Sequence, residues 1–323
     1  MGRALWVLAL TAFAAFGPQL SGAKELLSDP ISQAFSSARE TAAQAALGLQ
    51  GRPRRASAVL RVLTYNINGV PNLPKEKHER YREVGKILKR LREEGLAPQV
   101  VVVQEAFHPR TKELVSEAGY PHAQAGAPAN GTFLGSGLNI LSEYPIESFE
   151  TLDYSRCAGW DCFANKGVLR ARLKVPGLAH GLEVYTTHMN ADPQDGTSSD
   201  EALKARLAQA AELAEFVRRT KSGSPAVIAG DFNFRPGEAD YRLFSQLPGL
   251  KNAAEECSRS GACSGERDPE GVWRGAIDHQ FYLSGEPSGS LLPVHLEQTF
   301  KEPVGGEPLS DHWGLEARYL LVW

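Results

Sequence analysis

Two features that would define other classes of protein are missing from this sequence. Beyond the first 16 residues, no apolar run approaches the ~18 consecutive residues that a membrane-spanning helix needs. The chain also lacks an excess of basic residues, because 35 lysines and arginines are set against 38 aspartates and glutamates, giving a net charge of −3. Tight nonspecific binding of nucleic acid depends on neutralising phosphates, so this charge balance argues against nucleic acid as a partner.

The N-terminus is typical of an export signal. Arg3 supplies a positive charge, residues 4–16 form a short apolar run, and Ser21-Gly22-Ala23 has the spacing of a cleavage site. We therefore expect residues 1–23 to be the signal peptide of a secreted or periplasmic protein. The alternative is a buried first helix.

The rest of the chain divides into a short segment and one domain. Residues 24–58 are rich in alanine and serine and end in a cluster of arginines, which is typical of either a leader or a solvated linker. We expect the catalytic domain to occupy residues 59–323. The sequence contains no internal repeat and no low-complexity block.

The few cysteines become informative if the protein is exported. There are four, in two close pairs, Cys157 with Cys162 and Cys257 with Cys263. An even number in an oxidising compartment predicts two local disulfides. Neither pair has the second thiol pair or the histidines that a zinc site requires.

Strand and helix patterns alternate along the predicted domain. Apolar runs predict strands, and apolar residues at helical spacing predict helices over 77–92 and 201–219. The expected strands are 59–65, 100–103, 138–142, 168–173, 182–187, 226–229, 279–283 and 315–322. Because continuous apolar strands are buried on both faces, the pattern predicts an α/β fold in which helices flank stacked sheets.

Short polar motifs follow most of these apolar runs. They are Thr64-Tyr65-Asn66, Gln104-Glu105, Thr187-His188-Met189-Asn190, Gly230-Asp231-Phe232-Asn233, Ile277-Asp278 and Ser310-Asp311-His312. Unpaired polar groups at the edge of a core are costly, so strands that deliver them are building a site. Carboxylates, amides and imidazoles in this number suit a hard divalent metal and a phosphate ester.

The order of these motifs resembles that of the endonuclease/exonuclease/phosphatase superfamily over nearly all of residues 60–323. The resemblance implies a four-layer α/β sandwich, with two mixed β-sheets flanked by helices, of the DNase I-like type. A narrower resemblance lies in Gly137 to Ser142, Tyr144-Pro145-Ile146, and the cysteine-containing loop that ends in Asn165-Lys166-Gly167. These elements are similar to those of secreted neutral sphingomyelinases, which cleave sphingomyelin to ceramide and phosphocholine. By itself, Asn165-Lys166-Gly167 could equally be an ordinary turn.

The expected metal site is centred on Glu105, directly after a buried strand, with Asn66 and Asp311 completing it. Mg²⁺ takes one or two carboxylates together with substrate oxygens and keeps several waters; Mn²⁺ or Co²⁺ could replace it. The alternative for Glu105 is a surface position in a loop.

The expected catalytic residues are His312, His188, Asp231 and Asp278. His312 is the predicted general base for water, with its ring oriented by Asp278 or Asp231. His188 is the predicted phosphate stabiliser or acid, and the resemblance implies that Asp231 orients or activates the water. Substrate contacts are expected from Asn233, Asn190, Asn165 and Lys166. A lone histidine is more often structural, and the Gly-Asp-x-Asn sequence could be a simple Asx turn.

Three departures from the family pattern bear on these assignments. His279 follows Asp278 and could compete with His312 for that carboxylate. The stretch 284–309, where lytic sphingomyelinases often carry an aromatic-tipped hairpin, has only Phe300 as an aromatic residue. Trp160 and Phe163, in the cysteine-containing loop, are an alternative interfacial contact, although both could instead pack in the core.

The predicted function is that of a secreted Mg²⁺-dependent phosphodiesterase that hydrolyses sphingomyelin-type phospholipid by attack of water on phosphorus. Its expected partner is phospholipid at a membrane surface, contacted transiently by a monomer. A secreted nuclease of the same fold is the alternative enzyme. A binding protein that has lost catalysis is disfavoured, because every expected polar position is filled.

Overall fold

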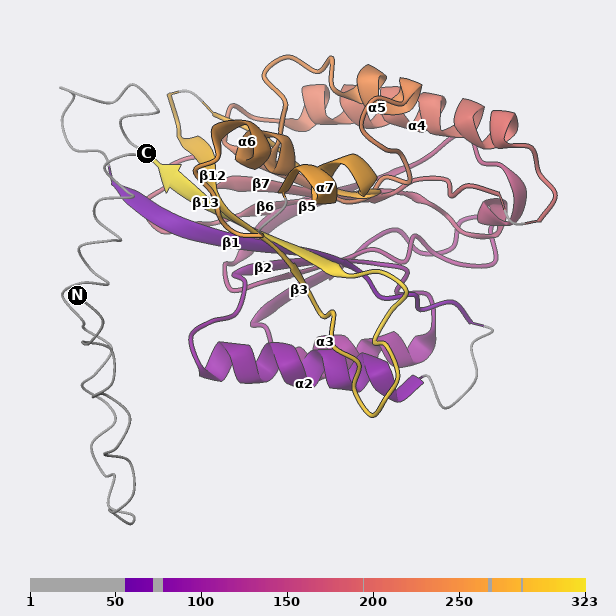
Figure 1. Ribbon diagram of the computed structural model, residues 1–323, viewed down its shortest axis with the longest axis horizontal. Coiled ribbons are helices and arrows are strands. Elements are labelled where there is room, and N and C mark those ends of the chain that lie inside the picture. Colours follow the sequence, from indigo (N-terminus) through magenta and orange to yellow (C-terminus); the bar gives the residue numbers. More distant parts are fainter. Residues whose placement is uncertain (1–55, 72–77, 194, 267–268, 286) are drawn as a thin grey trace, which may run out of the picture. The chain divides into compact units, whose positions relative to one another are not determined.

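The computed structural model describes residues 56–71, 78–193, 195–266, 269–285 and 287–323 (Figure 1). They belong to one compact unit, Gly51–Trp323. The expected signal peptide and nearly all of the segment 24–58 lie outside the described residues, so those boundaries remain predictions. Among the described helices, none is both long enough and apolar enough to cross a membrane.

Two mixed β-sheets form the centre of the unit. One has seven strands in the order β10-β12-β13-β1-β2-β4-β3, and the other has six in the order β5-β6-β7-β8-β11-β9. The first sheet contains β1 (Ser57–Asn66), β2 (Val100–Gln104), β3 (His122–Ala125), β4 (Asn139–Ser142), β10 (Ser264–Gly265), β12 (Ser290–Thr299) and β13 (Gly314–Val322). The second contains β5 (Ile146–Asp153), β6 (Gly167–Leu173), β7 (Leu182–His188), β8 (Ala226–Asp231), β9 (Lys251–Asn252) and β11 (Asp278–Leu283). The pairs β1–β2 and β7–β8 are parallel, whereas most other pairs are antiparallel.

Helices cover the outer faces of the sheets. Figure 1 shows α2 (Glu79–Glu93) and α3 (Lys112–Ala118) on one side of the sheets, with α4 (Ser199–Thr220) and α5 (Ala239–Phe244) on the other. The remaining elements are α6 (Ala253–Ser260), α7 (Pro269–Gly275) and the short 3-10 helices η2 (Pro109–Thr111) and η3 (Gly159–Phe163). The expected four-layer sandwich is therefore confirmed.

Side chains that point alternately to the two faces of each strand explain why the strands are apolar throughout. Val100 and Val102 of β2 face the core between the sheets, whereas Val101 and Val103 pack with α2 and α3. In β8, Val227 faces the same central core, and Ile228 packs with α4 and α5. Successive side chains of a strand point to opposite faces, so a strand between two layers must be apolar on both.

Buried amide side chains tie the two sheets to each other. Nε2 of Gln104, at the end of β2, donates to Oγ1 of Thr186 in β7 at 3.0 Å. Nε2 of Gln280 in β11 donates to the carbonyl oxygen of Val62 in β1 at 2.9 Å. Such buried hydrogen bonds are costly to break, so they fix the position of one sheet against the other close to the strand ends that carry the polar motifs.

Every strand and helix predicted from the sequence is present, with ends shifted by only a few residues. The strands β3, β5, β9, β10 and β12 were not predicted, and β12 is the longest of them. It lies within 284–309, contains Pro293 and has a bulge between Pro293 and His295, yet it pairs with β13 along its length. Proline removes a ladder hydrogen bond and weakens a strand pattern. Residues 301–308, which follow β12, are exposed and correspond to a surface loop.

Candidate active site

The ends of five strands bring the polar motifs together. β1 ends at Asn66, β2 leads directly into Glu105, β7 ends at His188, β8 ends at Asp231 and β11 begins at Asp278. His188 and Asp231 are register partners in the parallel pair β7–β8, and Asp231 and Asp278 are partners in the antiparallel pair β8–β11. The sheet hydrogen bonds therefore place these side chains side by side.

Asp231 lies at the centre of the cluster and is almost fully buried. Its Oδ2 accepts a hydrogen bond from Nδ2 of Asn66 at 2.9 Å and lies 3.6 Å from Nε2 of His188 and 3.8 Å from Nε2 of His312. Burial, and then the nearby charge of Asp278, raise the pKa of Asp231 to about 7, against the opposing influence of His312. A second positive charge would therefore stabilise this carboxylate.

Glu105 is held beside Asp231 by the same amide. Nδ2 of Asn66 donates to Oε1 of Glu105 at 2.9 Å, and that oxygen lies 3.9 Å from Nε2 of His188. The backbone of Glu105 has φ = 58°, a left-handed conformation that is uncommon for a residue with a side chain. Burial raises the pKa of Glu105, and the hydrogen bond from Asn66 acts in the opposite direction.

His312 is paired with Asp278, as one of the two sequence-based alternatives expected. Nδ1 of His312 lies 2.7 Å from Oδ2 of Asp278. Burial alone would lower the pKa of His312, but the hydrogen bond and charge of Asp278, with the charges of Asp231 and Asp311, raise it to about 10. The imidazole is therefore protonated at neutral pH in this arrangement.

The neighbouring His279 does not compete for Asp278. It is buried on the other side of the strand, with Nε2 3.0 Å from the carbonyl oxygen of Phe234 and Nδ1 3.3 Å from Nδ2 of Asn252. Consecutive strand residues point to opposite faces, which separates His279 from the cluster.

His188 has a buried cation as its nearest polar neighbour. Nζ of Lys166 lies 3.0 Å from Nε2 of His188, 2.9 Å from the carbonyl oxygen of Met189 and 2.8 Å from Oδ1 of Asp161. Burial, and then the charges of Lys166 and His312, lower the pKa of His188 well below its usual range. The ring is therefore neutral near pH 7, which suits a hydrogen-bonding role better than that of an acid.

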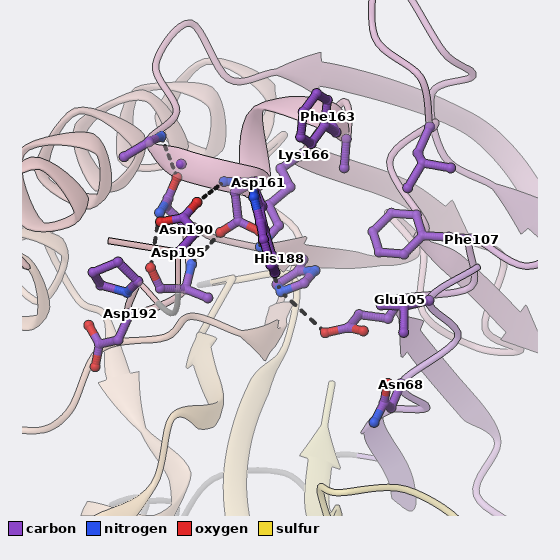
Figure 2. Close-up of a pocket in the computed structure, with 18 of the residues that line it drawn as sticks. Asn68, Glu105, Phe107, Asp161, Phe163, Lys166, His188, Asn190, Asp192 and Asp195 are labelled. Atoms are coloured by element: carbon purple, nitrogen blue, oxygen red, sulfur yellow. Dashed lines mark hydrogen bonds and ion pairs between the residues drawn. The ribbon is translucent and has the colours of Figure 1, made fainter. Parts of the chain in front are cut away.

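A cavity of about 320 Å³ opens beside these groups (Figure 2). Glu105, Lys166, His188, Asn190 and Asp311 line it, together with Phe107 and residues of the cysteine-containing loop. Figure 2 shows Phe107 and Glu105 on one wall, with Lys166, Asp161 and Asn190 on the other. A second cavity is lined by Asp278, Asp311, His312 and Trp313 among others, and shares Asp311 with the first.

The three asparagines predicted to contact substrate are engaged with backbone groups. Nδ2 of Asn233 donates to the carbonyl oxygen of Met189 and Nδ2 of Asn165 to that of Pro128, each at 3.0 Å. Oδ1 of Asn190 accepts from the backbone N–H of Ala158 at 2.8 Å. Of the three, Asn190 lines the cavity; their roles toward substrate remain predictions.

Two site features were missed or left open by the sequence. Asp161, which pairs with Lys166 and accepts from the backbone N–H of Ala191 at 2.5 Å, was not predicted as a site residue. The sequence feature that could have identified Asp161 is its position between the paired cysteines, five residues before Lys166. Trp160 and Phe163 are exposed, which rules out the alternative that they pack in the core.

The structure has both expected cysteine pairs as disulfides, Cys157–Cys162 and Cys257–Cys263.

The donor atoms fit a divalent cation. Two groups have ligand atoms that all lie within 4.8 Å of one another, namely Glu105 with His188 and Asp231, and Asp231 with Asp278 and His312. Glu105 and Asp231 are carboxylates whose pKa is raised by burial, and a hard cation would stabilise their charged forms. Asn66 presents its Nδ2 to both carboxylates, so its predicted role as a ligand would require the opposite amide orientation.

The chain belongs to the Endonuclease/Exonuclease/phosphatase family, whose model matches residues 63–312. Within that family it is similar to a putative neutral sphingomyelinase of Drosophila melanogaster, with 27% identity over 81% of this chain and 61% of that protein. It is also similar to human sphingomyelin phosphodiesterase 2, with 27% identity over 80% of this chain and 64% of that protein. The chain thus spans less than two thirds of the length of these curated relatives. The chain is homologous to proteins named as sphingomyelinases or sphingomyelin phosphodiesterases.

Solved structures agree on the fold. A Staphylococcus aureus beta toxin variant with bound magnesium ions matches with a TM-score of 0.62 at 16% identity, over 80% of this chain and 99% of that one. TDP2 of D. rerio, complexed with a single-strand DNA product, matches with a TM-score of 0.61 at 18% identity, over 81% of this chain and 99% of that one. At identities this low, the structural similarity shows the fold but not the substrate.

Proposed function

We propose that this protein is a secreted, Mg²⁺-dependent phosphodiesterase that hydrolyses sphingomyelin to ceramide and phosphocholine. The observation that carries the proposal is the convergence of Glu105, His188, Asp231 and His312 beside the buried cation Lys166. The similarity to proteins named as neutral sphingomyelinases, and the lack of a net positive charge, favour lipid over nucleic acid.

Mg²⁺ would be held by Glu105 and Asp231, with the exposed Asp311, which lines both cavities, nearby. When bound, the ion would supply positive charge for the phosphate oxygens and lower the pKa of water beside it. It would also offset two of the carboxylate charges, those of Asp231 and Asp311, that keep His312 protonated.

His312 and Asp231 would position and activate the attacking water. Their closest side-chain atoms are 3.8 Å apart, which exceeds a direct hydrogen bond but leaves one water within hydrogen-bond reach of both. Asp278 holds Nδ1 of His312, so Nε2 faces that position. His312 accepts the proton of the water as general base, which requires the neutral ring that nearby positive charge favours.

The opposite wall of the cavity would hold the phosphate. Lys166 offers a cation whose position is fixed by Asp161 and by the carbonyl oxygen of Met189. Preorganised donors of this kind stabilise the charge that develops on phosphoryl oxygens in the transition state. His188, kept neutral by burial, contributes a hydrogen bond rather than a proton.

Extracytoplasmic location is part of the proposal. Two disulfides within short loops support it, because disulfides persist in oxidising compartments. The apolar N-terminal run supports it as well, although that segment is outside the described residues.

The test is an assay of the purified protein against sphingomyelin, phosphatidylcholine and DNA, each with Mg²⁺ and with EDTA. We expect release of phosphocholine from sphingomyelin with Mg²⁺ and none with EDTA. Equal turnover in EDTA would refute the metal assignment. Cleavage of DNA without cleavage of either lipid would replace the lipid substrate with the nuclease alternative.

A further inference from the structure

We propose that Phe133, Trp160 and Phe163 form a docking surface, here called the aromatic platform, that inserts into electrically neutral, phosphocholine-containing bilayers. The inference rests on the proposed function, because it assigns the surface through which a lipid substrate would reach the site. It assigns docking to a different part of the molecule from the stretch 284–309, where lytic sphingomyelinases often carry an aromatic-tipped hairpin.

The platform side chains are unusually exposed for large aromatic residues. Phe133 is 81% exposed, Trp160 69% and Phe163 50%. The rings of Phe133 and Phe163 meet edge to face, with centroids 5.4 Å apart. Each aromatic side chain offers on the order of 150–250 Å² of surface, so the cluster forms an exposed apolar patch of the kind that marks an interaction site.

The platform is continuous with the catalytic cavity. Trp160 and Phe163 line the cavity that also contains Lys166 and His188, and Leu134 lines it directly after Phe133. Figure 2 shows Phe163 above Lys166 at this edge of the cavity. A lipid held at the platform would therefore present its phosphate close to the catalytic groups.

Backbone contacts hold the two platform loops together. The backbone N–H of Leu134 donates to the carbonyl oxygen of Phe163 at 2.9 Å, and that of Asn165 donates to the carbonyl oxygen of Leu134 at 3.0 Å. The backbone N–H of Trp160 donates to Oδ2 of Asp195 at 2.6 Å, within the loop closed by the Cys157–Cys162 disulfide. A fixed surface loses less conformational entropy on docking than mobile loops would.

The chemistry of the platform selects a neutral lipid surface. Residues 123–142 contain no ionisable side chain, in a chain in which 23% of residues are charged. The loop 157–165 contains only Asp161, which is paired with Lys166. Attraction to anionic lipids requires a cluster of lysines or arginines near the membrane surface. The loop between β5 and β6 has only the exposed Arg156 and the buried, ion-paired Lys166, which is too few for such a cluster. Trp and Phe instead suit the interface itself, where apolar rings meet polar head groups.

The loop after β12 is poorly suited to the same task. Val304 pairs with Glu307 across a tip formed by Gly305 and Gly306, so the exposed turn carries one apolar side chain beside a charge. Burying a charged group in lipid is costly. The platform is therefore the better docking surface near the cavity.

The test compares Phe133→Glu with Phe149→Glu in the full chain. Phe133 is at the platform and outside the cavity lining, whereas Phe149 is also exposed, at 51% against 81%, but lies on the edge strand β5. We expect Phe133→Glu to weaken sedimentation with phosphatidylcholine/sphingomyelin vesicles about tenfold or more, and to lower vesicle hydrolysis equally. Turnover of a water-soluble nitrophenyl phosphodiester should be unchanged, and Phe149→Glu should match the wild type in all three assays.

Tryptophan quenching by brominated lipids locates the contact independently. We expect quenching to persist in Trp313→Phe, which alters the exposed tryptophan of the second cavity, and to be lost in Trp160→Phe. The reverse pattern, unchanged binding in Phe133→Glu, or wild-type binding that requires anionic lipid would each overturn the platform. If the wild type binds vesicles through the platform but releases no phosphocholine, the docking surface stands and the proposed substrate falls.

Discussion

The catalytic cluster and the loops around it are built in different ways. Asn66, His188 and Asp231 are buried, and the hydrogen bonds of the two sheets set their positions. Phe133 and Trp160 are exposed, and local backbone contacts with one short disulfide hold them in place. The two regions meet at Lys166, which contacts His188 on one side and Asp161 on the other.

This difference assigns separate tasks to the two regions. Strand ends fix catalytic atoms in a geometry that chemistry at phosphorus requires, because small displacements there are costly. Loops can change sequence without disturbing the sheets, so under the proposed function they are where the site would acquire its substrate. Substitutions in the cluster should therefore lower turnover on every substrate, whereas loop changes should depend on the form in which substrate is presented.

The largest effect is expected for His312→Ala in the cluster. Loss of a positioned general base lowers kcat by about 10²–10⁴-fold, and the loss should be equal for vesicles and for a soluble diester. His180 provides the matched control, because its side chain is exposed in a loop and its contacts use only the backbone carbonyl. Circular dichroism should be unchanged for both variants. A loss of less than tenfold for His312→Ala would remove it as the base.

A smaller loss is expected for Lys166→Met at the boundary. Methionine keeps most of the side-chain volume but removes the charge, and loss of one preorganised donor costs about 10²-fold in kcat. Lys174→Met, just beyond the far end of the same strand and exposed, is the control. Melting temperature must be followed too, because the change leaves Asp161 without its cation. A change in KM without a change in kcat would show that Lys166 acts with the loops in substrate binding rather than with the cluster in turnover.

The cluster was largely predictable from the sequence because its members follow apolar strands. The apolar run 226–229 predicts a buried strand, and the sheet then leaves Asp231 no position other than the strand end. The pairing of His312 with Asp278 was one of two alternatives, since sequence gives the strands but not which carboxylate the incoming loop meets. The sequence left open whether His279 contacts Asp278. Only the alternation of side chains along the strand, which points the two residues to opposite faces, excludes that contact.

The loops were less predictable because nothing periodic positions them. Exposure of Trp160 and Phe163 was an open alternative, and Phe133 carried no signal, since its contact with Phe163 joins segments 30 residues apart. The strand β12 was missed because Pro293 interrupts its pattern, whereas its pairing with β13 is a tertiary effect.

The smallest effect, and the sharpest comparison of regions, comes from the two disulfides. They close loops of nearly equal size, with sequence separations of 5 and 6, so the chain-entropy model predicts a similar loss of about 2 kcal/mol in stability for each.

Only Cys157–Cys162 encloses Trp160 and Asp161. We expect the double Cys→Ser variant of Cys157 and Cys162 to raise KM for vesicles several-fold with little change in kcat on a soluble diester. The same change at Cys257 and Cys263 should lower melting temperature alone, because Cys257 lies within α6 and neither cysteine lines either cavity of the site. Equal kinetic effects from both pairs would show that the cysteine-containing loop acts only through general stability.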